Sequence, residues 1–188
     1  MHASSTRHPA YFFALFLASA TALLLAATPA QAASAAKIDK QVDQTLETFK
    51  QMEGAKPFLG IAKAVLVFPK VYKAGIGVGG EYGEGALRVN GKTVDYYSTA
   101  AASFGFQLGA QAKSIVVLFT DESALKSFRE SDGWNVGVDG SVALVDIGIG
   151  KNLDTTTFKD PVIGFIFGQK GLMYNLTLEG SKFTKLTK

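Results

Sequence analysis

Hydrophobic residues near the middle of the chain follow two patterns, and each of them predicts a β-strand. Residues 64–68 form a continuous apolar run that ends at Pro69, which is typical of a strand buried on both faces. Over residues 74–80, glycines alternate with Ile76 and Val78, so one face carries the apolar side chains and the other face is bare. A bare face allows a second layer to approach closely, and it also allows the strand to bend sharply.

A helix is predicted over residues 37–52, where apolar residues recur every three or four positions, and Gly54 and Pro57 predict its end. Residues 37–53 carry three lysines and four acidic residues, whereas helices that lie on membranes usually carry mainly basic residues on the polar face. A helix packed on a sheet is therefore favoured over an interfacial membrane helix. The apolar stripe consists of Ile38, Val42, Leu46, Phe49 and Met52.

A β-hairpin is predicted around Asn90-Gly91, because both residues tolerate the positive φ angles of a two-residue type I′ turn. Apolar and polar residues alternate on both sides of this turn. The simplest register places Leu87 opposite Val94, on the face shared with Val89 and Tyr96.

Three further elements follow in the second half of the chain. Residues 115–119 are fully apolar and predict a central buried strand. Asp121 is a suitable N-cap for a short helix over residues 122–131. Residues 135–150 read as a strand whose apolar phase changes at 144–145, which predicts a bulge or a bend there.

A last hairpin is predicted from residues 162–167 and 172–178, which flank a glycine-containing turn. The elements add up to an α+β domain, in which an N-terminal amphipathic helix packs on a strongly curved, barrel-like antiparallel β-sheet with one short inserted helix.

The first 32 residues have the features of a signal peptide rather than of a folded element. A weakly basic start is followed by an apolar stretch and by Ala30-Gln31-Ala32, which fits signal-peptidase cleavage after Ala32. The apolar stretch is short for a retained anchor and contains Ser and Thr. We therefore expect an exported, periplasmic protein, with residues 33–188 forming a single domain.

Composition excludes several classes of function. The chain has no cysteine, so it has no disulfide and no acylated cysteine of a lipoprotein, and its two histidines lie at positions 2 and 8. Removing Arg7 with the signal leaves 18 basic and 16 acidic residues, a net charge of +2, which does not indicate a nucleic-acid binder. Without histidine or cysteine, the domain lacks the usual groups for zinc or nucleophilic catalysis, so we predict no enzyme, no metal and no cofactor.

Four local motifs have a catalytic or ligand-binding interpretation, and for each a structural interpretation is favoured. The glycines of residues 75–80 are followed by Glu81 and Glu84 instead of the helix that a nucleotide-binding loop needs. The two glutamates are not favoured as a catalytic pair, because glycine-rich turns often carry exposed acids. Residues 123–126 match S-x-x-K without its companion motifs, so Lys126 is interpreted as a solvated helix residue. Trp134 is interpreted as a core residue.

Lysines form the remaining candidate site. Four lysines and no acid lie between residues 54 and 80, and further lysines close the chain. If the two groups met in space, they would form a surface that attracts anionic lipid headgroups. The predicted lipid-binding residues are Lys56, Lys63, Lys70, Lys73, Lys182 and Lys185.

The glycine-rich stretch also resembles a known family. The string from Lys73-Ala74-Gly75 through Gly79-Gly80 to Tyr82-Gly83-Glu84-Gly85, together with later segments in the expected order, is similar to the SYLF domain family. This resemblance covers nearly the whole domain. It implies membrane phosphoinositide binding, as in eukaryotic members, and actin-filament binding, as in fungal members, while bacterial members are mostly exported.

The leading hypothesis is a non-enzymatic exported domain that binds anionic phospholipid or a membrane surface. The alternatives are a barrel-like module that binds a small apolar ligand, an envelope domain that binds an as yet unidentified protein partner, and a small protein that crosses the outer membrane with its strands.

Overall fold

The computed structural model describes residues 33–146, 159–170 and 177–188, and within them it leaves out the side chains of 76–77, 103–109, 146 and 170. Residues Ala33–Lys188 form one compact unit. The predicted signal peptide, residues 147–150 of the predicted strand and residues 172–176 of the last predicted hairpin lie outside the described residues.

Two helices precede the sheet. Helix α2 (Ala35–Lys50) is capped by Ser34 and buries Ile38, Val42 and Phe49, so the predicted apolar stripe packs on the sheet. Helix α3 (Ala55–Ile61) was not predicted, because Pro57 was interpreted as a stop. Pro57 lies in the first turn of α3, where the amide hydrogen that proline lacks would have no partner inside the helix.

Acidic residues of α2 hold this helix against the hairpin that follows. Asp39 accepts hydrogen bonds from Thr93 (2.6 Å) and from the Tyr96 hydroxyl (2.8 Å), and Asp43 lies 2.8 Å from the Arg88 guanidinium. The slight excess of acid on this helix is thus used for docking onto the sheet.

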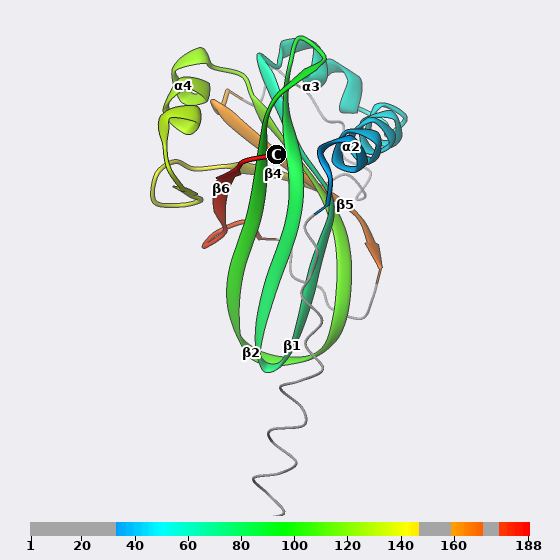
Figure 1. The fold of residues 1–188 in the computed structure, drawn as a ribbon, viewed down its shortest axis with the longest axis vertical. Coiled ribbons are helices and arrows are strands. Elements are labelled where there is room, and N and C mark those ends of the chain that lie inside the picture. The colour runs from blue at the N-terminus through cyan, green and yellow to red at the C-terminus, as the bar shows by residue number, and fades with distance from the viewer. Residues whose placement is uncertain (1–32, 147–158, 171–176) are drawn as a thin grey trace, which may run out of the picture. The chain divides into compact units, whose positions relative to one another are not determined.

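The sheet is built around one very long hairpin that folds back on itself. Strand β1 (Ala64–Val89) pairs antiparallel with β2 (Lys92–Phe119) along its whole length, and both strands reverse direction near their middle (Figure 1). The turn has φ angles of 50° at Asn90 and 77° at Gly91, as the type I′ prediction requires.

The predicted register next to this turn is wrong by one residue. A bulge between Leu87 and Arg88 places Leu87 opposite Asp95 instead of Val94. Leu87 is therefore buried in one core while Tyr96 packs against the other, so the two side chains do not share a face. Sequence alternation alone does not reveal an inserted residue.

Glycines allow the two halves of β1 to approach each other. A Cβ atom on Gly75 would lie 2.4 Å from the Cα of Gly79, inside the bend itself. Further along, a Cβ on Gly83 would lie 2.7 Å from the carbonyl oxygen of Lys70, and one on Gly85 would lie 2.0 Å from that of Val67. The bare strand face thus has both predicted uses, bending and close packing.

The remaining strands extend the two halves of β2 in different directions. Strand β5 (Val162–Lys170) pairs with the second half of β2, and β6 (Lys182–Leu186) pairs with the first half. The short strands β3 (Trp134–Asn135) and β4 (Ala143–Asp146) complete a six-stranded sheet among the described residues.

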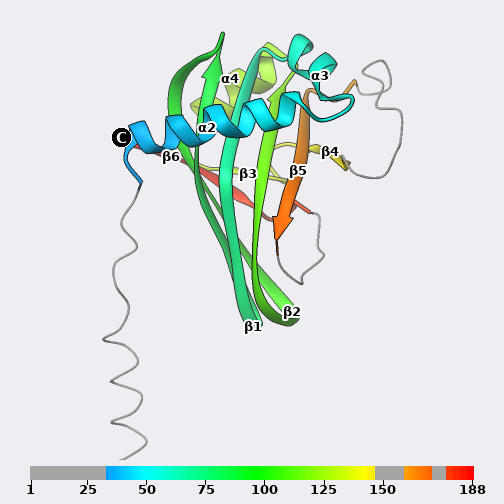
Figure 2. The same cartoon turned by 90° about the vertical axis from the view of Figure 1, so that its right-hand side faces the viewer.

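The described sheet is strongly curled into a half-barrel, so the predicted α+β fold class is confirmed (Figures 1 and 2). One pair departs from the antiparallel prediction, because β4 runs parallel to β5.

The elements between β2 and β5 agree with prediction only in part. Helix α4 (Glu122–Glu130) starts as predicted, with the Asp121 carboxylate accepting a hydrogen bond from the Ala124 amide at 2.9 Å. The single strand predicted over 135–150 is wrong, because a turn with a φ of 90° at Gly137 separates β3 from β4. The predicted bulge at 144–145 is absent, since these residues pair with consecutive residues of β5.

Two apolar cores lie on the two faces of the sheet. The inner core lies within the curl and contains aromatic residues of β1, β2, α4, β3 and β6. The outer core lies between the sheet and helices α2 and α3. Val67 and Val116 belong to the outer core, whereas Leu66 and Val117 belong to the inner one, which confirms that residues 64–68 and 115–119 are buried on both faces.

We expect Gly85→Ala to destabilise the protein by at least about 2 kcal/mol, because its methyl group would overlap the Val67 carbonyl and neither backbone segment can move freely. Gly60→Ala is the matched control. A Cβ there meets nothing within 4 Å, and alanine favours helix α3 by up to about 1 kcal/mol. Urea denaturation compares the two, and equal stabilities would contradict the close-approach argument.

Candidate functional site

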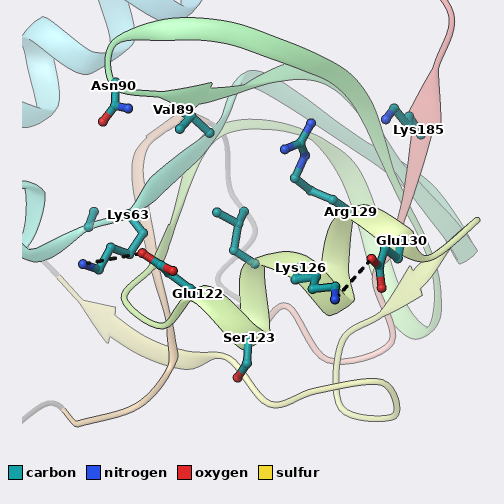
Figure 3. A pocket seen from close by; sticks show the side chains of 11 residues that line it. Lys63, Val89, Asn90, Glu122, Ser123, Lys126, Arg129, Glu130 and Lys185 are labelled. Carbon is teal, nitrogen blue, oxygen red and sulfur yellow. Dashed lines mark ion pairs between the residues drawn. The ribbon is translucent and has the colours of Figure 1, made fainter.

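A basic groove lies at the end of the domain that holds the hairpin turn. It is a hollow of about 970 Å³ between the start of β1, the turn, helix α4 and strand β6 (Figure 3). Its charged lining residues are four cations and two carboxylates: Lys63, Lys126, Arg129, Lys185, Glu122 and Glu130. Lys63 belongs to the first of the two lysine groups found in the sequence, and Lys185 belongs to the second. One member of each predicted group therefore lines this groove.

The cations of the basic groove differ in how closely they are paired. Arg129 and Lys185 both bind Asp95, with nitrogen–oxygen distances of 2.9 and 2.6 Å. Lys63 and Lys126 have only loose partners, at 4.0 Å from Glu122 and 3.9 Å from Glu130. Lys63 and Lys126 are therefore the cations most able to turn toward an incoming anion.

Local structure explains why these side chains converge. Lys63 directly precedes β1, and its amide donates a hydrogen bond to the Phe119 carbonyl at 2.7 Å, which fixes the start of β1 beside the end of β2. Lys126 and Arg129 are three residues apart on α4 and so share one face of this helix. Strand β6 pairs with β2 and brings Lys185 alongside Tyr97, next to Asp95.

The other predicted lysines lie elsewhere. Lys56 is exposed on α3, and Lys70 lines a second hollow of about 480 Å³ beside α2. Lys182 lies on β6 with its Cε atom against Gly133. The structure thus brings Lys63 and Lys185 together and leaves these three apart from them.

Lys73 is not at the surface. Its side chain points inside the folded hairpin, the residue is 3% exposed, and its Nζ lies 3.3 Å from Oε1 of Glu81. The prediction that Lys73 contacts a headgroup does not agree with this placement. The sequence does not show toward which face of β1 the Lys73 side chain points. The bulge between Phe68 and Val71 shifts the alternation of side chains and so sets this direction.

Lys73 belongs to a group that we call the buried ion cluster, formed by Lys73, Glu81, Lys113 and Gln111. The Lys113 ammonium lies 2.8 Å from Oε2 of Glu81 without a well-directed hydrogen bond, so charge attraction dominates this contact. The Gln111 amide donates to the side-chain oxygen of Gln169 at 3.2 Å. One carboxylate therefore faces two ammonium groups away from water.

Glu84 has separate partners, so the two glutamates do not form a carboxylate pair. Its Oε2 accepts hydrogen bonds from the Ala33 amide and from Lys188 Nζ, both at 3.0 Å, and its Oε1 accepts one from the Tyr82 hydroxyl at 2.9 Å. Burial opposes ionisation of Glu84, but the hydrogen bonds from Lys188 and Tyr82 outweigh it and hold the pKa of this carboxyl below its usual value.

The remaining motifs have structural roles. The Ser123 hydroxyl donates a hydrogen bond to the Asp121 cap, and Lys126 approaches Glu130 rather than a serine. Trp134 is buried and stacks on Phe183 at a centroid distance of 5.9 Å, as the core interpretation predicts. None of the described helices combines the length and the apolar character that a membrane span requires.

Sequence reasoning missed two groups of charged residues. Lys126 was interpreted as a solvated helix residue and Arg129 was not considered, although both line the basic groove. Their spacing shows that they share one face of a predicted helix. The sequence does not show that this helix lies beside Lys63. Lys113 was missed because it precedes an apolar strand and its partner, Glu81, is 32 positions away.

We expect Glu81→Ala to destabilise the protein by about 3–5 kcal/mol, because it leaves two buried ammonium groups without a counter-charge. Glu47→Ala is the matched control. It breaks the exposed Lys50–Glu47 pair, whose oxygen–nitrogen distance is 2.7 Å, and should cost less than about 0.5 kcal/mol. Chemical denaturation of both variants measures the difference, and a small loss in Glu81→Ala would show that the cluster is hydrated or uncharged.

Part of the chain matches a protein-family model. Residues 100–188 match the Ysc84 family, which is described as "Las17-binding protein actin regulator". A search of curated protein sequences found no significant match. The matched segment contains most of β2, α4 and β3–β6, and it supplies Arg129 and Lys185 of the basic groove together with Lys113 of the buried ion cluster. This match confirms the resemblance read from the sequence: residues 100–188 are similar to the Ysc84 (SYLF) family, whose description names a binding protein.

Proposed function

We propose that the protein is an exported, non-enzymatic domain whose basic groove binds an anionic group of the phosphate class, such as an anionic lipid headgroup. The observation that carries this proposal is the convergence of four cations from three separate parts of the chain. Lys63, the pair Lys126 and Arg129, and Lys185 line one hollow at the surface.

Charge geometry supports an anionic ligand over a neutral one. Asp95 neutralises part of the charge of Arg129 and Lys185, while Lys63 and Lys126 keep loose, solvent-exposed partners that an incoming anion can replace at little cost. A lysine near an anionic membrane contributes about 1 kcal/mol to binding, so two such residues give moderate and salt-sensitive affinity.

The family match supports a binding role without indicating the ligand. Its description concerns Las17 binding and actin regulation in the family, and a protein partner is a second candidate for this domain. The internal apolar-ligand hypothesis is less well supported, because side chains fill the inside of the curl. The Phe183 ring contacts the rings of Phe68, Phe128 and Trp134 there, and Phe128 also contacts Trp134.

We expect the double substitution Lys63→Glu, Lys126→Glu to weaken binding to vesicles that contain phosphatidylglycerol by at least about tenfold and to flatten the salt dependence of binding. Vesicle flotation at several salt concentrations measures both. The control is Lys37→Glu, Lys40→Glu, which changes the net charge equally on the exposed face of α2.

Two outcomes separate the sources of the anion. If inorganic phosphate displaces the protein from the vesicles, the groove recognises the phosphate group itself; if it does not, the groove needs the membrane surface. Equal loss of binding in the groove variant and in the α2 variant would show that only net charge matters, and the groove would then have no role.

Export is tested separately. We expect protein recovered from the periplasm to begin at Ala33, because the Ala30-Gln31-Ala32 sequence fits signal-peptidase cleavage. N-terminal sequencing of that fraction reads the cleavage site directly. Recovery of an uncleaved chain from the cytoplasm would refute this location.

A further inference from the structure

The end of the hairpin opposite the basic groove has an unusual surface. We define the folded end as residues 72–82 of β1 and 100–113 of β2, where both strands reverse. Figures 1 and 2 both show it projecting away from helices α2, α3 and α4, which gather at the other end of the described unit. Helix α2 borders its base, where Tyr72 and Ala112 line the second hollow with residues of α2. Beyond that base, α2, α3 and α4 leave the outer face uncovered.

The exposed surface of the folded end is uncharged. Tyr72, Val78 and Tyr82 are 59%, 63% and 50% exposed. Among the residues of the folded end whose burial the structure describes, every other exposed position is alanine or glycine. The backbone register at the fold also pairs Val78 with Phe104, so the apolar sequence continues across both strands.

The inner side of the folded end is polar. The buried ion cluster lies there, with Lys73, Glu81, Lys113 and Gln111 all turned away from solvent. Charged groups inside and apolar groups outside are the reverse of the arrangement that water favours.

The helix-covered half of the same two strands has the ordinary arrangement. Leu66, Leu87 and Val117 fill the inner core, and the outer face is covered by α2 and α3 through residues such as Val67 and Val116. The reversal of polarity is therefore confined to the folded end and is not a property of the whole hairpin.

A lipid bilayer is the environment that suits this reversal. Strands immersed in lipid place apolar side chains outward and satisfy polar groups inward. Tyrosine prefers the boundary between hydrocarbon and headgroups, and Tyr72 and Tyr82 stand at such a boundary. Tyr72 is next to exposed Lys70 along the outer face of β1, and the Tyr82 hydroxyl bonds Glu84, which pairs with Lys188.

We propose that the folded end of the β1–β2 hairpin inserts into the hydrocarbon region of a membrane, with Val78 at the deepest described position and the two tyrosines at the headgroup level. About five residues separate Tyr72 from the bend, so the inserted depth is about 15 Å, half of a hydrocarbon core about 30 Å thick. The hairpin enters one leaflet and does not span the bilayer.

This contact is distinct from binding at the basic groove. The groove lies next to the hairpin turn, at the other end of the strands, and it depends on charge, whereas insertion depends on apolar surface. Insertion is therefore measured on vesicles of neutral phosphatidylcholine at high salt, where electrostatic attraction is screened. An experiment can therefore refute one of the two proposals without affecting the other.

The first test compares two exposed valines. We expect Val78→Asp to weaken salt-resistant binding to phosphatidylcholine vesicles by at least about tenfold, because it places a charge in hydrocarbon. Val138→Asp is the control, since Val138 is 82% exposed in the turn between β3 and β4. Both changes lie at the surface and should leave the denaturation midpoint nearly unchanged. Absence of salt-resistant binding by the unchanged protein, or equal binding by all three proteins, would overturn the proposal.

The second test uses the absence of cysteine, which allows a single label to be attached at a chosen position. We expect a polarity-sensitive dye on Val78→Cys to shift to shorter wavelength on vesicles and to be quenched by lipids brominated along the acyl chain. The same dye on Lys92→Cys, beside the hairpin turn, should show neither change. A label at residue 78 that stays water-exposed on membrane-bound protein would refute insertion while leaving the groove proposal intact.

Discussion

The close approach of the two halves of β1 is the constraint on which the rest of the structure depends. Gly83 and Gly85 lie against the backbone of residues 67–71, so closely that no side chain fits between them. This contact turns one long hairpin into two facing layers. It also directs the two halves of β2 toward different partners, β5 and β6, and thereby curls the sheet. Without it, the two strands would form an open two-stranded ribbon that encloses no core.

Folding the hairpin also divides it into two ends with different chemistry. At the helix-covered end, both faces of the strands are buried and the two apolar cores supply the driving force for folding. At the folded end, the facing layers enclose Lys73, Glu81 and Lys113, and the outer face beyond its base has no covering element among the described residues. Buried charge of this kind adds little net stability, so its presence is better explained by the surroundings of that end than by the requirements of folding.

The two candidate contacts follow from this division. The basic groove exists because the hairpin turn, α4 and β6 meet at the helix-covered end, where Asp95 holds Arg129 and Lys185 in place. The uncharged surface exists because β1 and β2 extend beyond their helices. On these two proposals, the domain would bind at two separate ends, and its affinities there would respond differently to salt and to lipid charge.

The sequence alone determined the elements whose signal is local. The stripe of α2, the Asp121 cap, the Asn90-Gly91 turn and the doubly buried strands follow from spacing and backbone preference. The resemblance to a family was read separately, from the glycine-rich motif and the segments after it. Tertiary structure decided which lysines point outward, since bulges at 68–71 and 87–88 shift the side-chain phase. It also decided that Lys63 meets Lys126 and Lys185, and that Glu81 meets Lys113. These contacts join residues far apart in the chain, and only the fold of the hairpin brings such residues together.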